Sequence, residues 1–369
     1  MKKYIAILLA LVMVLGLAAC GGSSKPADSG SAGAAVSVAM VTDYGDITDQ
    51  SFNQTTYEAC KAFCEENGVD FTYYKPASDS DEDRISMIEK AIDDGFSVIV
   101  MPGYAFAPAI AATAEDYDDV TFIALDVSEF DLNSAGLEEL PANLYSAVYQ
   151  EELCGYMAGY AAVKLGYTKL GFLGGMAVPA VVRYGYGFVQ GADAAAAELE
   201  LADVEIKYAY GNQFYGDADI TAAMDTWYAD GTEVVFACGG GIYTSAVDAA
   251  KKVDGKVIGV DVDQAGVIQN YAEAEDTSMT ITSAMKGLAA TVNTELAAVL
   301  DGSFEGGKVE NLGLVSEIPE ENYVQLAGST QFSDASALRI TPRWSVPCSR
   351  ARSWSPTTSR STLPIWPLL

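Results

Sequence analysis

Residues 234–261 read VVFACGGGIYTSAVDAAKKVDGKVIGVD, and this stretch decides the fold. Two short apolar runs, Val234–Ala237 and Val257–Val260, flank an alanine-rich segment with helical spacing over residues 243–253. The first run ends in a glycine-rich turn and the second ends in Asp261. Two strands joined by a crossover helix lie parallel in a sheet that helices cover on both faces. The stretch therefore predicts one strand–helix–strand unit of an α/β fold.

The same alternation recurs along the chain from residue 36. The predicted strands are Val36–Thr42, Phe71–Tyr74, Val98–Met101, Val120–Leu125, Leu170–Leu173, Val204–Tyr208, Val234–Ala237, Val257–Val260 and Met279–Thr282. The predicted helices cover residues 50–66, 82–94, 106–117, 150–165, 185–200, 217–230, 243–253 and 285–301. Four strand–helix units precede residues 132–143 and about four follow. Residues 36–334 are thus predicted to form two doubly wound α/β lobes with parallel sheets and a boundary near residues 142–150.

The composition excludes several classes of protein. The 369 residues carry 51 Asp+Glu against 21 Lys+Arg, a formal net charge of −30, and no histidine. Such a charge repels the phosphates of nucleic acids, so no nucleic-acid partner is expected. Without histidine the chain cannot form a Ser-His-Asp or Cys-His catalytic site, and the usual zinc ligand sets are missing. We expect no metal and no cofactor.

The amino terminus has the pattern of an export signal. Two lysines follow Met1, an apolar run spans residues 4–15, and small residues lead to Cys20. The run is shorter than the roughly 20 residues of a spanning helix, which makes a transmembrane anchor the weaker interpretation. Residues 17–21 (LAACG) resemble a bacterial lipobox, which implies that residues 1–19 are cleaved and that Cys20 is lipidated. The alternative is an ordinary signal peptide with a chance cysteine.

A flexible tether is predicted to follow Cys20. Residues 21–35 are rich in glycine, serine and alanine, and a chain of this kind reaches on the order of 20 Å. We therefore expect segment 20–35 to hold the binding domain at the extracytoplasmic face of the cell membrane through the lipid anchor. Of the other cysteines, Cys60, Cys64, Cys154, Cys238 and Cys348, none forms a CxxC pair. Buried free thiols are the default interpretation, and no disulfide can be assigned.

Carboxylates and a glycine turn follow the predicted strands at their carboxyl ends. Asp43, Asp126 and Asp261 each come directly after a strand, as does the glycine turn at residues 239–241. Ligands of such sheets bind at this edge, where carboxylates accept hydrogen bonds from hydroxyls and a glycine turn lets the backbone approach a ligand. The alternative is that each aspartate caps the helix that follows it.

At this point the sequence resembles a known family. The resemblance rests on residues 41–54 (VTDYGDITDQSFNQ), 171–176 (GFLGGM), 258–264 (IGVDVDQ) and 283–286 (SAMK), and it covers residues 36 to about 330 in order. These elements are similar to those of the basic membrane protein family, the PnrA/TmpC-like purine-nucleoside-binding lipoproteins of ABC importers. The resemblance implies a type I periplasmic-binding-protein fold, whose two lobes close on the ligand about a hinge. It also implies that the chain recrosses between lobes near residues 265–285 and 305–320.

The resemblance implies a ligand-binding role for eight residues. Phe52 would stack on the purine, Asn53 would bond its edge, and Asp43 would lie near the base. Tyr184, where the family commonly has phenylalanine, would be the second stacking aromatic. The ribose hydroxyls would be held by Asp126 and Asp261, with help from Gly240 and Lys286. From the residues alone, Phe52 is equally a core residue, Lys286 an exposed charge and Tyr184 one of 21 tyrosines.

Three other functions stay open at this stage. The first is a nucleoside hydrolase-like enzyme that uses paired carboxylates. The second is a sugar- or autoinducer-binding protein of the same fold, and the third is a sensor or surface antigen without transport. The spacing of aspartates in residues 43–49 does not match a calcium loop, and the chain has no Walker A motif, so the expected partners are a purine nucleoside and separate permease subunits.

The last 35 residues differ in composition from the rest. Residues 335–369 contain no Asp, Glu or Gly, but five arginines, three of the four tryptophans and five of the 12 prolines. The family resemblance fades near residues 328–334. We interpret the segment as a frameshifted or non-native tail; the alternative is a genuine basic tail.

Overall fold

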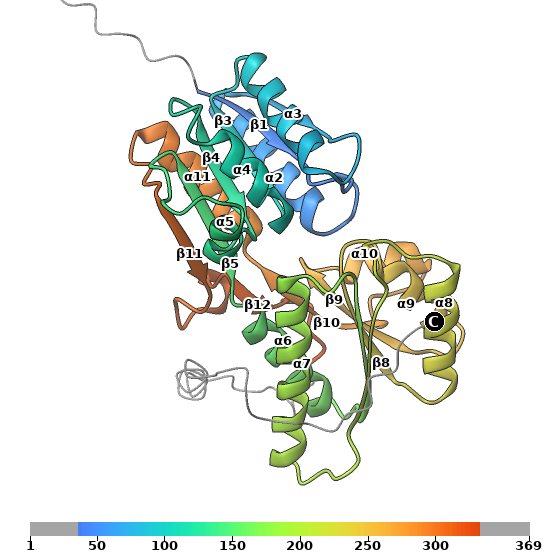
Figure 1. Cartoon of the computed structure of the whole chain (residues 1–369). Helices are drawn as coiled ribbons and strands as arrows, with labels where there is room; N and C mark the ends of the chain where they lie inside the picture. Colours follow the sequence, from blue (N-terminus) through green and yellow to red (C-terminus); the bar gives the residue numbers. More distant parts are fainter. Residues whose placement is uncertain (1–35, 333–369) are drawn as a thin grey trace, which may run out of the picture. The chain divides into compact units, whose positions relative to one another are not determined.

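The computed structural model describes residues 36–332 (Figure 1). The predicted signal peptide (1–19), the tether (20–35) with the lipidation site Cys20, and the predicted tail (335–369) lie outside the described residues. Over residues 36–332, no helix combines the length and the apolar character needed to cross a bilayer.

The first sheet is parallel throughout, in the strand order β11-β5-β4-β3-β1-β2. Its strands are β1 (Ser37–Val41), β2 (Asp70–Tyr74), β3 (Val98–Pro102), β4 (Thr121–Leu125), β5 (Leu144–Tyr149) and β11 (Lys308–Leu312). The second sheet has the order β12-β10-β9-β8-β6-β7, and only β12 is antiparallel, to β10. Its strands are β6 (Lys169–Gly174), β7 (Glu205–Tyr210), β8 (Val234–Cys238), β9 (Lys256–Asp261), β10 (Thr280–Lys286) and β12 (Val324–Leu326). The predicted pair of α/β lobes with parallel sheets is confirmed.

Helices connect the strands as the periodicity predicts. They are α2 (Phe52–Asn67), α3 (Asp81–Asp93), η1 (Tyr104–Phe106), α4 (Ala107–Thr113), α5 (Glu129–Ser134), α6 (Glu151–Lys164), α7 (Pro179–Glu198), α8 (Ala218–Ala229), α9 (Tyr243–Ala250), α10 (Ala265–Ala272), α11 (Leu288–Asp301) and η2 (Pro319–Glu321). The short helices α5 and α10 were not predicted. Helix α7 begins at Pro179, ahead of the predicted residue 185, because proline fits the first turn of a helix.

The chain passes between the two sheets three times. It leaves the first sheet after β5, returns to it after β10, and leaves it again after β11. The stretch 142–150, predicted as a boundary, contains β5, so the first passage falls at Gln150. The second lies just beyond the predicted 265–285, because β10 continues to Lys286 before α11 packs on α2. The third lies between Leu312 and Val324, in the region of the predicted 305–320.

Glycines allow α6 and α7 to pack backbone against backbone (Figure 1). A Cβ atom at Gly155 would lie 2.0 Å from the carbonyl oxygen of Tyr184, and one at Gly187 would lie 1.9 Å from that of Glu152. No larger residue fits at either position, because real Cβ atoms do not come this close to backbone atoms. This contact fixes the part of α7 that carries Arg183 and Tyr184 against the start of α6.

The core strands are apolar on both faces, as expected of strands covered by helices on either side. All five residues of β3 and of β8 are buried. Cys60, Cys64, Cys154 and Cys238 are buried free thiols, which confirms the prediction for these four. Cys348 lies outside the described residues.

Candidate functional site

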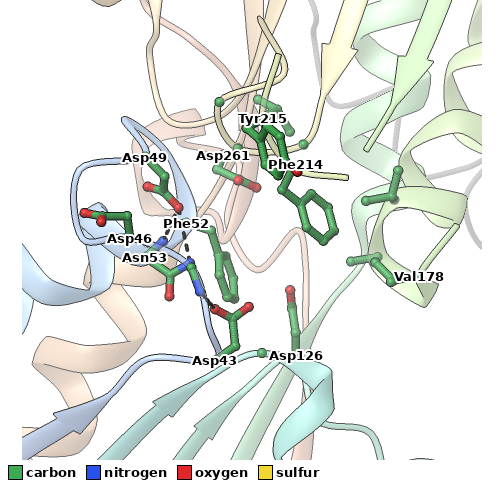
Figure 2. A pocket seen from close by; sticks show the side chains of 18 of the residues that line it. Asp43, Asp46, Asp49, Phe52, Asn53, Asp126, Val178, Phe214, Tyr215 and Asp261 are labelled. Atoms are coloured by element: carbon green, nitrogen blue, oxygen red, sulfur yellow. Dashed lines mark hydrogen bonds between the residues drawn. The ribbon is translucent and has the colours of Figure 1, made fainter. Parts of the chain in front are cut away.

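The carboxyl ends of strands from both sheets line one cavity of about 390 Å³ (Figure 2). All eight residues that the sequence analysis assigned to ligand binding line it: Asp43, Phe52, Asn53, Asp126, Tyr184, Gly240, Asp261 and Lys286. They come from five strand ends or following loops and from helices α2 and α7. The structure therefore brings together residues that are up to 243 positions apart in the chain.

Asp43 and Asn53 form the end of the cavity nearest β1. One oxygen of Asp43, Oδ1, accepts hydrogen bonds from the backbone N–H groups of Tyr44 and Gly45, both at 2.6 Å. Burial raises the pKa of Asp43, although these bonds and the charge of Arg84 act in the opposite direction. The side-chain oxygen of Asn53 is buried and has no hydrogen-bond partner among the described residues. An acceptor in this position can take a donor from a bound molecule.

Asp49 explains why the loop before α2 keeps this shape. Its carboxylate accepts from the backbone N–H groups of Ser51, Asn53 and Gln54, at 2.9, 2.9 and 3.0 Å. These N–H groups lie at the start of α2, where no helix carbonyl is available to accept from them. Asp49 accepts from them instead and thereby fixes the following Phe52 and Asn53 (Figure 2). The sequence analysis quoted Asp49 within the family motif but gave it no role.

Lys286 is the buried cation of the site. Its Nζ lies 2.6 Å from Asp126 Oδ2, 3.4 Å from Glu151 Oε1 and 3.8 Å from Asp261 Oδ1. It also lies 4.6 Å from the centre of the Phe52 ring, within reach of a cation–π interaction. Burial acts to lower the pKa of Lys286, but the three carboxylates together raise it above its usual value, so the lysine stays charged.

Glu151 is a member of this cluster that sequence analysis missed. It is the first residue of α6, it is fully buried, and its second carboxylate oxygen accepts from Arg183 Nε at 2.6 Å. Burial raises the pKa of Glu151, against the opposing attraction of Lys286. No local pattern marks it, because an acidic residue in the first turn of a helix is common.

Asp126 and Asp261 do not cap the helices that follow them. Ser128 caps α5 through its side chain, and Gln264 stands at the cap of α10. Both aspartates instead adopt left-handed backbone conformations, with φ of 63° and 65°, which directs their side chains to the cavity. Since Asp49 rather than Asp43 satisfies the start of α2, the capping alternative fails for all three strand-end aspartates.

The aromatic walls differ from the expectation. Tyr184 lines the cavity, but its ring is only 1% exposed and packs edge-on against Phe236 at 5.9 Å, with its hydroxyl 3.4 Å from the Ala284 carbonyl oxygen. In Figure 2, the Phe214 side chain from the loop between β7 and α8 points into the space that Phe52 faces. Phe214 was not predicted, although its place after a strand at the ligand-binding edge was a usable signal.

Two glycines position Phe214. A Cβ at Gly175 would lie 2.5 Å from Cδ1 of Phe214, and one at Gly239 would lie 3.0 Å from the same atom. Gly240, with φ of 52°, continues the turn, and a Cβ there would lie 3.0 Å from the Phe214 carbonyl oxygen. The glycine turn therefore supports the aromatic residue as well as lining the cavity.

Within residues 36–332, no cluster of three or more Cys, Asp or Glu side chains has an arrangement that could hold a metal ion. One oxygen each of Asp126, Asp261 and Asp43 accepts from a lysine, a hydroxyl and a backbone donor, respectively.

Comparison with known families identifies the chain. Residues 36–349 match the family described as ABC transporter substrate-binding protein PnrA-like. The chain belongs to this family. The matched range runs past residue 334, the boundary that composition suggests for the carboxyl-terminal segment, and the interpretation of that segment as non-native stays a prediction.

Relatives and solved structures agree with this assignment. The ABC transporter nucleoside-binding protein BmpA of Lactococcus lactis is 28% identical, over 85% of this chain and 89% of its own. Basic membrane protein A of Borreliella burgdorferi is 28% identical, over 75% and 76%. ABC transporter solute-binding proteins from Aeropyrum pernix and Conexibacter woesei superpose with TM-scores of 0.67 and 0.63, at 22% and 23% identity. The alignment with the first structure covers 79% of this chain and 76% of that protein, and the alignment with the second covers 86% of this chain and 97% of that protein. These superpositions show that the fold is that of type I solute-binding proteins.

Proposed function

We propose that this protein captures purine nucleosides outside the cytoplasm and delivers them to the permease of an ABC importer. One observation supports this proposal most strongly. A single cavity combines two aromatic side chains, Phe52 and Phe214, with the carboxylates Asp126 and Asp261 beside Lys286. A planar base stacks on aromatic rings for roughly 1–3 kcal/mol each, and a ribose diol donates to carboxylates. The nucleoside-binding Lactococcus relative supports the same ligand class.

Unpaired acceptors support a ligand that donates hydrogen bonds at both ends. Asp126 Oδ1 and Asn53 Oδ1 are buried and have no partner among the described residues. A ribose hydroxyl fits the first, and an N–H of the base edge fits the second. Asp43 lines the cavity as well, and in this proposal it accepts a further hydrogen bond from the same edge of the base.

The charge of the cavity favours a nucleoside over a nucleotide. Five aspartates line it, Asp43, Asp46, Asp49, Asp126 and Asp261, against Lys75 and Lys286. A phosphate group would be repelled at short range by this surplus of negative charge.

In this proposal the protein binds and does not catalyse. The nucleoside enters between the lobes, the lobes close, and the closed form docks on permease subunits in the membrane. The Cys20 lipid anchor and the tether keep it at the extracytoplasmic face. The anchor is tested in cells fed with radioactive palmitate. We expect the wild-type chain to be labelled and a Cys20→Ser variant to stay unlabelled.

The ligand is tested by mass spectrometry of small molecules released from denatured recombinant protein, followed by calorimetric titration. We expect inosine, guanosine or adenosine to bind, and uridine, free ribose and inosine monophosphate to bind far more weakly. Sugars binding in place of nucleosides would overturn the purine assignment. Multiple-turnover release of hypoxanthine from inosine would identify a hydrolase instead.

A further inference from the structure

Two loops from different sheets are bonded directly to each other. Residues 50 and 51, just before α2, meet residue 261, the last of β9, and residue 264, just after it. Ser51 Oγ donates to Asp261 Oδ2 at 2.5 Å, and Gln264 Nε2 donates to the Gln50 carbonyl oxygen at 3.0 Å. We call these two hydrogen bonds the latch. Its members belong to the sequence elements DQSFN and GVDVDQ quoted above.

The Gln264 side of the latch is preorganised. Gln264 is fully buried, its Oε1 accepts from the Val260 N–H at 2.9 Å, and its own N–H donates to Ser283 Oγ at 3.1 Å. A Cβ at Gly259 would lie 2.9 Å from both Cβ and Oε1 of Gln264, so only glycine leaves room for this arrangement. With its oxygen engaged, the amide can present only its N–H₂ to the other lobe.

The facing loop is fixed as well. Gln50 has a left-handed backbone with φ of 56°, and its N–H and Nε2 both donate to Gln54 Oε1, at 3.0 and 2.7 Å. This geometry turns the Gln50 carbonyl toward Gln264. Ser51 occupies the cap position of α2 without using its side chain to cap the helix, so its hydroxyl serves Asp261 alone.

Gln50, Ser51 and Gln264 do not line the ligand cavity. The cavity is lined from both sheets, so separation of the lobes takes the cavity apart and breaks the latch at the same time. We propose that the latch is an affinity determinant made by three residues outside the cavity and by Asp261, which lines it, and that it stabilises the closed arrangement of the lobes and slows release of the ligand. For ligand release, this inference rests on the proposed function.

The size of the effect follows from ordinary hydrogen-bond energies. The Gln264 bond joins two neutral groups and contributes an amount equivalent to roughly three- to tenfold in an equilibrium constant, whereas the Ser51 bond to the Asp261 carboxylate contributes roughly ten- to a hundredfold. The latch forms when the lobes close, so its loss raises the rate at which the ligand-bound protein opens and the nucleoside dissociates.

The experiment compares latch variants with matched controls in the full-length chain. Ser51→Ala removes one bond and Gln264→Met the other. Ser146→Ala and Gln331→Met are the same substitutions at residues whose side chains donate within one lobe. Ser146 Oγ donates to the Val127 carbonyl at 2.6 Å, and Gln331 Nε2 donates to the Ser278 and Thr280 carbonyls at 3.0 and 2.8 Å. The release rate of inosine is measured by stopped flow. The closed fraction is measured by the distance between spin labels at exposed residues Glu65 and Asp230, with Cys20 and Cys348 replaced by serine.

We expect Gln264→Met to release inosine about three- to tenfold faster and Ser51→Ala about ten- to a hundredfold faster. Both should shift the ligand-free distances to longer values, with both controls unchanged. Wild-type distances and release rates in both latch variants would overturn the proposal, as would equal changes in the controls. Should the wild-type protein bind no purine nucleoside, the proposed function fails, and the spin-label distances alone decide whether the latch exists.

Discussion

Asp126 and Asp261 occupy corresponding positions in the two lobes but are used differently. Each follows a core strand, each has a left-handed backbone, and each lies near Lys286 Nζ, at 2.6 and 3.8 Å. Asp126 keeps one oxygen without a partner among the described residues, whereas Asp261 Oδ2 accepts from Ser51 of the other lobe. Asp126 is therefore open to a ligand and contacts the second lobe through Lys286 at the end of β10, whereas Asp261 also bonds Ser51 of the first lobe.

Lys286 holds this pair together, and its loss is expected to have the largest effect. Lys286→Met leaves Asp126, Asp261 and Glu151 buried with only Arg183 to balance them. We expect a loss of about 3–5 kcal/mol in the free energy of unfolding, measured by urea denaturation, and no detectable nucleoside binding.

The matched control is Lys252→Met. Lys252 is exposed and paired with Asp225 at 2.7 Å, and a surface ion pair contributes only about 0–1 kcal/mol. If Lys286→Met and Lys252→Met have equal free energies of unfolding, the buried carboxylates do not need Lys286 for the stability of the fold.

Asparagine tests the two aspartates separately, because it tolerates a left-handed backbone. Asp126→Asn and Asp261→Asn each replace a charged acceptor of the ribose, and we expect each to weaken nucleoside binding about 10- to 100-fold by calorimetry. Asp261→Asn should lengthen the ligand-free distances between lobes more than Asp126→Asn does. Asp126 contacts the second lobe at Lys286, where β10 ends and the chain crosses between the sheets, whereas Asp261 bonds Ser51 away from the crossings. The same distance distribution in both variants would remove the distinction between the two residues.

A smaller effect tests the aromatic contribution of the second lobe. Gly175→Ala places a Cβ 2.5 Å from Phe214 Cδ1 and must displace the ring. We expect nucleoside affinity to fall about tenfold, by part of the stacking energy of roughly 1–3 kcal/mol. In a Phe214→Leu background the same change should have little further effect, because the two substitutions act through one ring.

Gly266→Ala is the control, since a Cβ there meets no atom within 4 Å. If Gly175→Ala binds as well as Gly266→Ala does, Phe214 is not a stacking wall, and the second lobe contributes mainly carboxylate and backbone groups.

The smallest effect concerns pH. Burial raises the pKa of Asp261, although Lys286 and Ser51 oppose the shift. The folded state then binds this proton more tightly than the unfolded state, so the contribution of Asp261 to stability falls as pH rises through the raised pKa. Asp261→Asn removes this contribution, and its thermal midpoint should improve relative to wild type as pH rises from 4 to 7. If the thermal midpoints of the two proteins change with pH in the same way, the pKa of Asp261 is not raised.

The predicted elements were found where the sequence had a strong periodic signal. All nine predicted strands and all eight predicted helices are present. The missed strands β5, β11 and β12 are different in character, because β11 (KVENL) is a partly exposed edge strand with charged residues and β12 has only three residues. Strand β5 (LYSAVY) is buried, but its serine and tyrosines interrupt the apolar run. Such strands form because a neighbouring strand offers hydrogen bonds.

The sequence predicted the residues at the strand ends that line the cavity, but not the side chains from other segments that contact them. Aspartates and glycines that end strands can be seen in the sequence, because the ligand-binding edge of a parallel sheet follows from chain direction. Glu151 and the support that Gly175 gives to Phe214 carry no such local signal, because their roles depend on contacts with distant segments.

Periodicity and short motifs are local properties of the chain, and they already predict the two α/β lobes, the strand-end carboxylates and the family. The fold adds that one lysine serves three carboxylates, from residues 126, 151 and 261, and that Ser51 and Gln264 join the lobes. Hydrophobic periodicity reports which face of an element is buried. It does not report which side chains, more than 100 residues away, meet that face when the lobes pack.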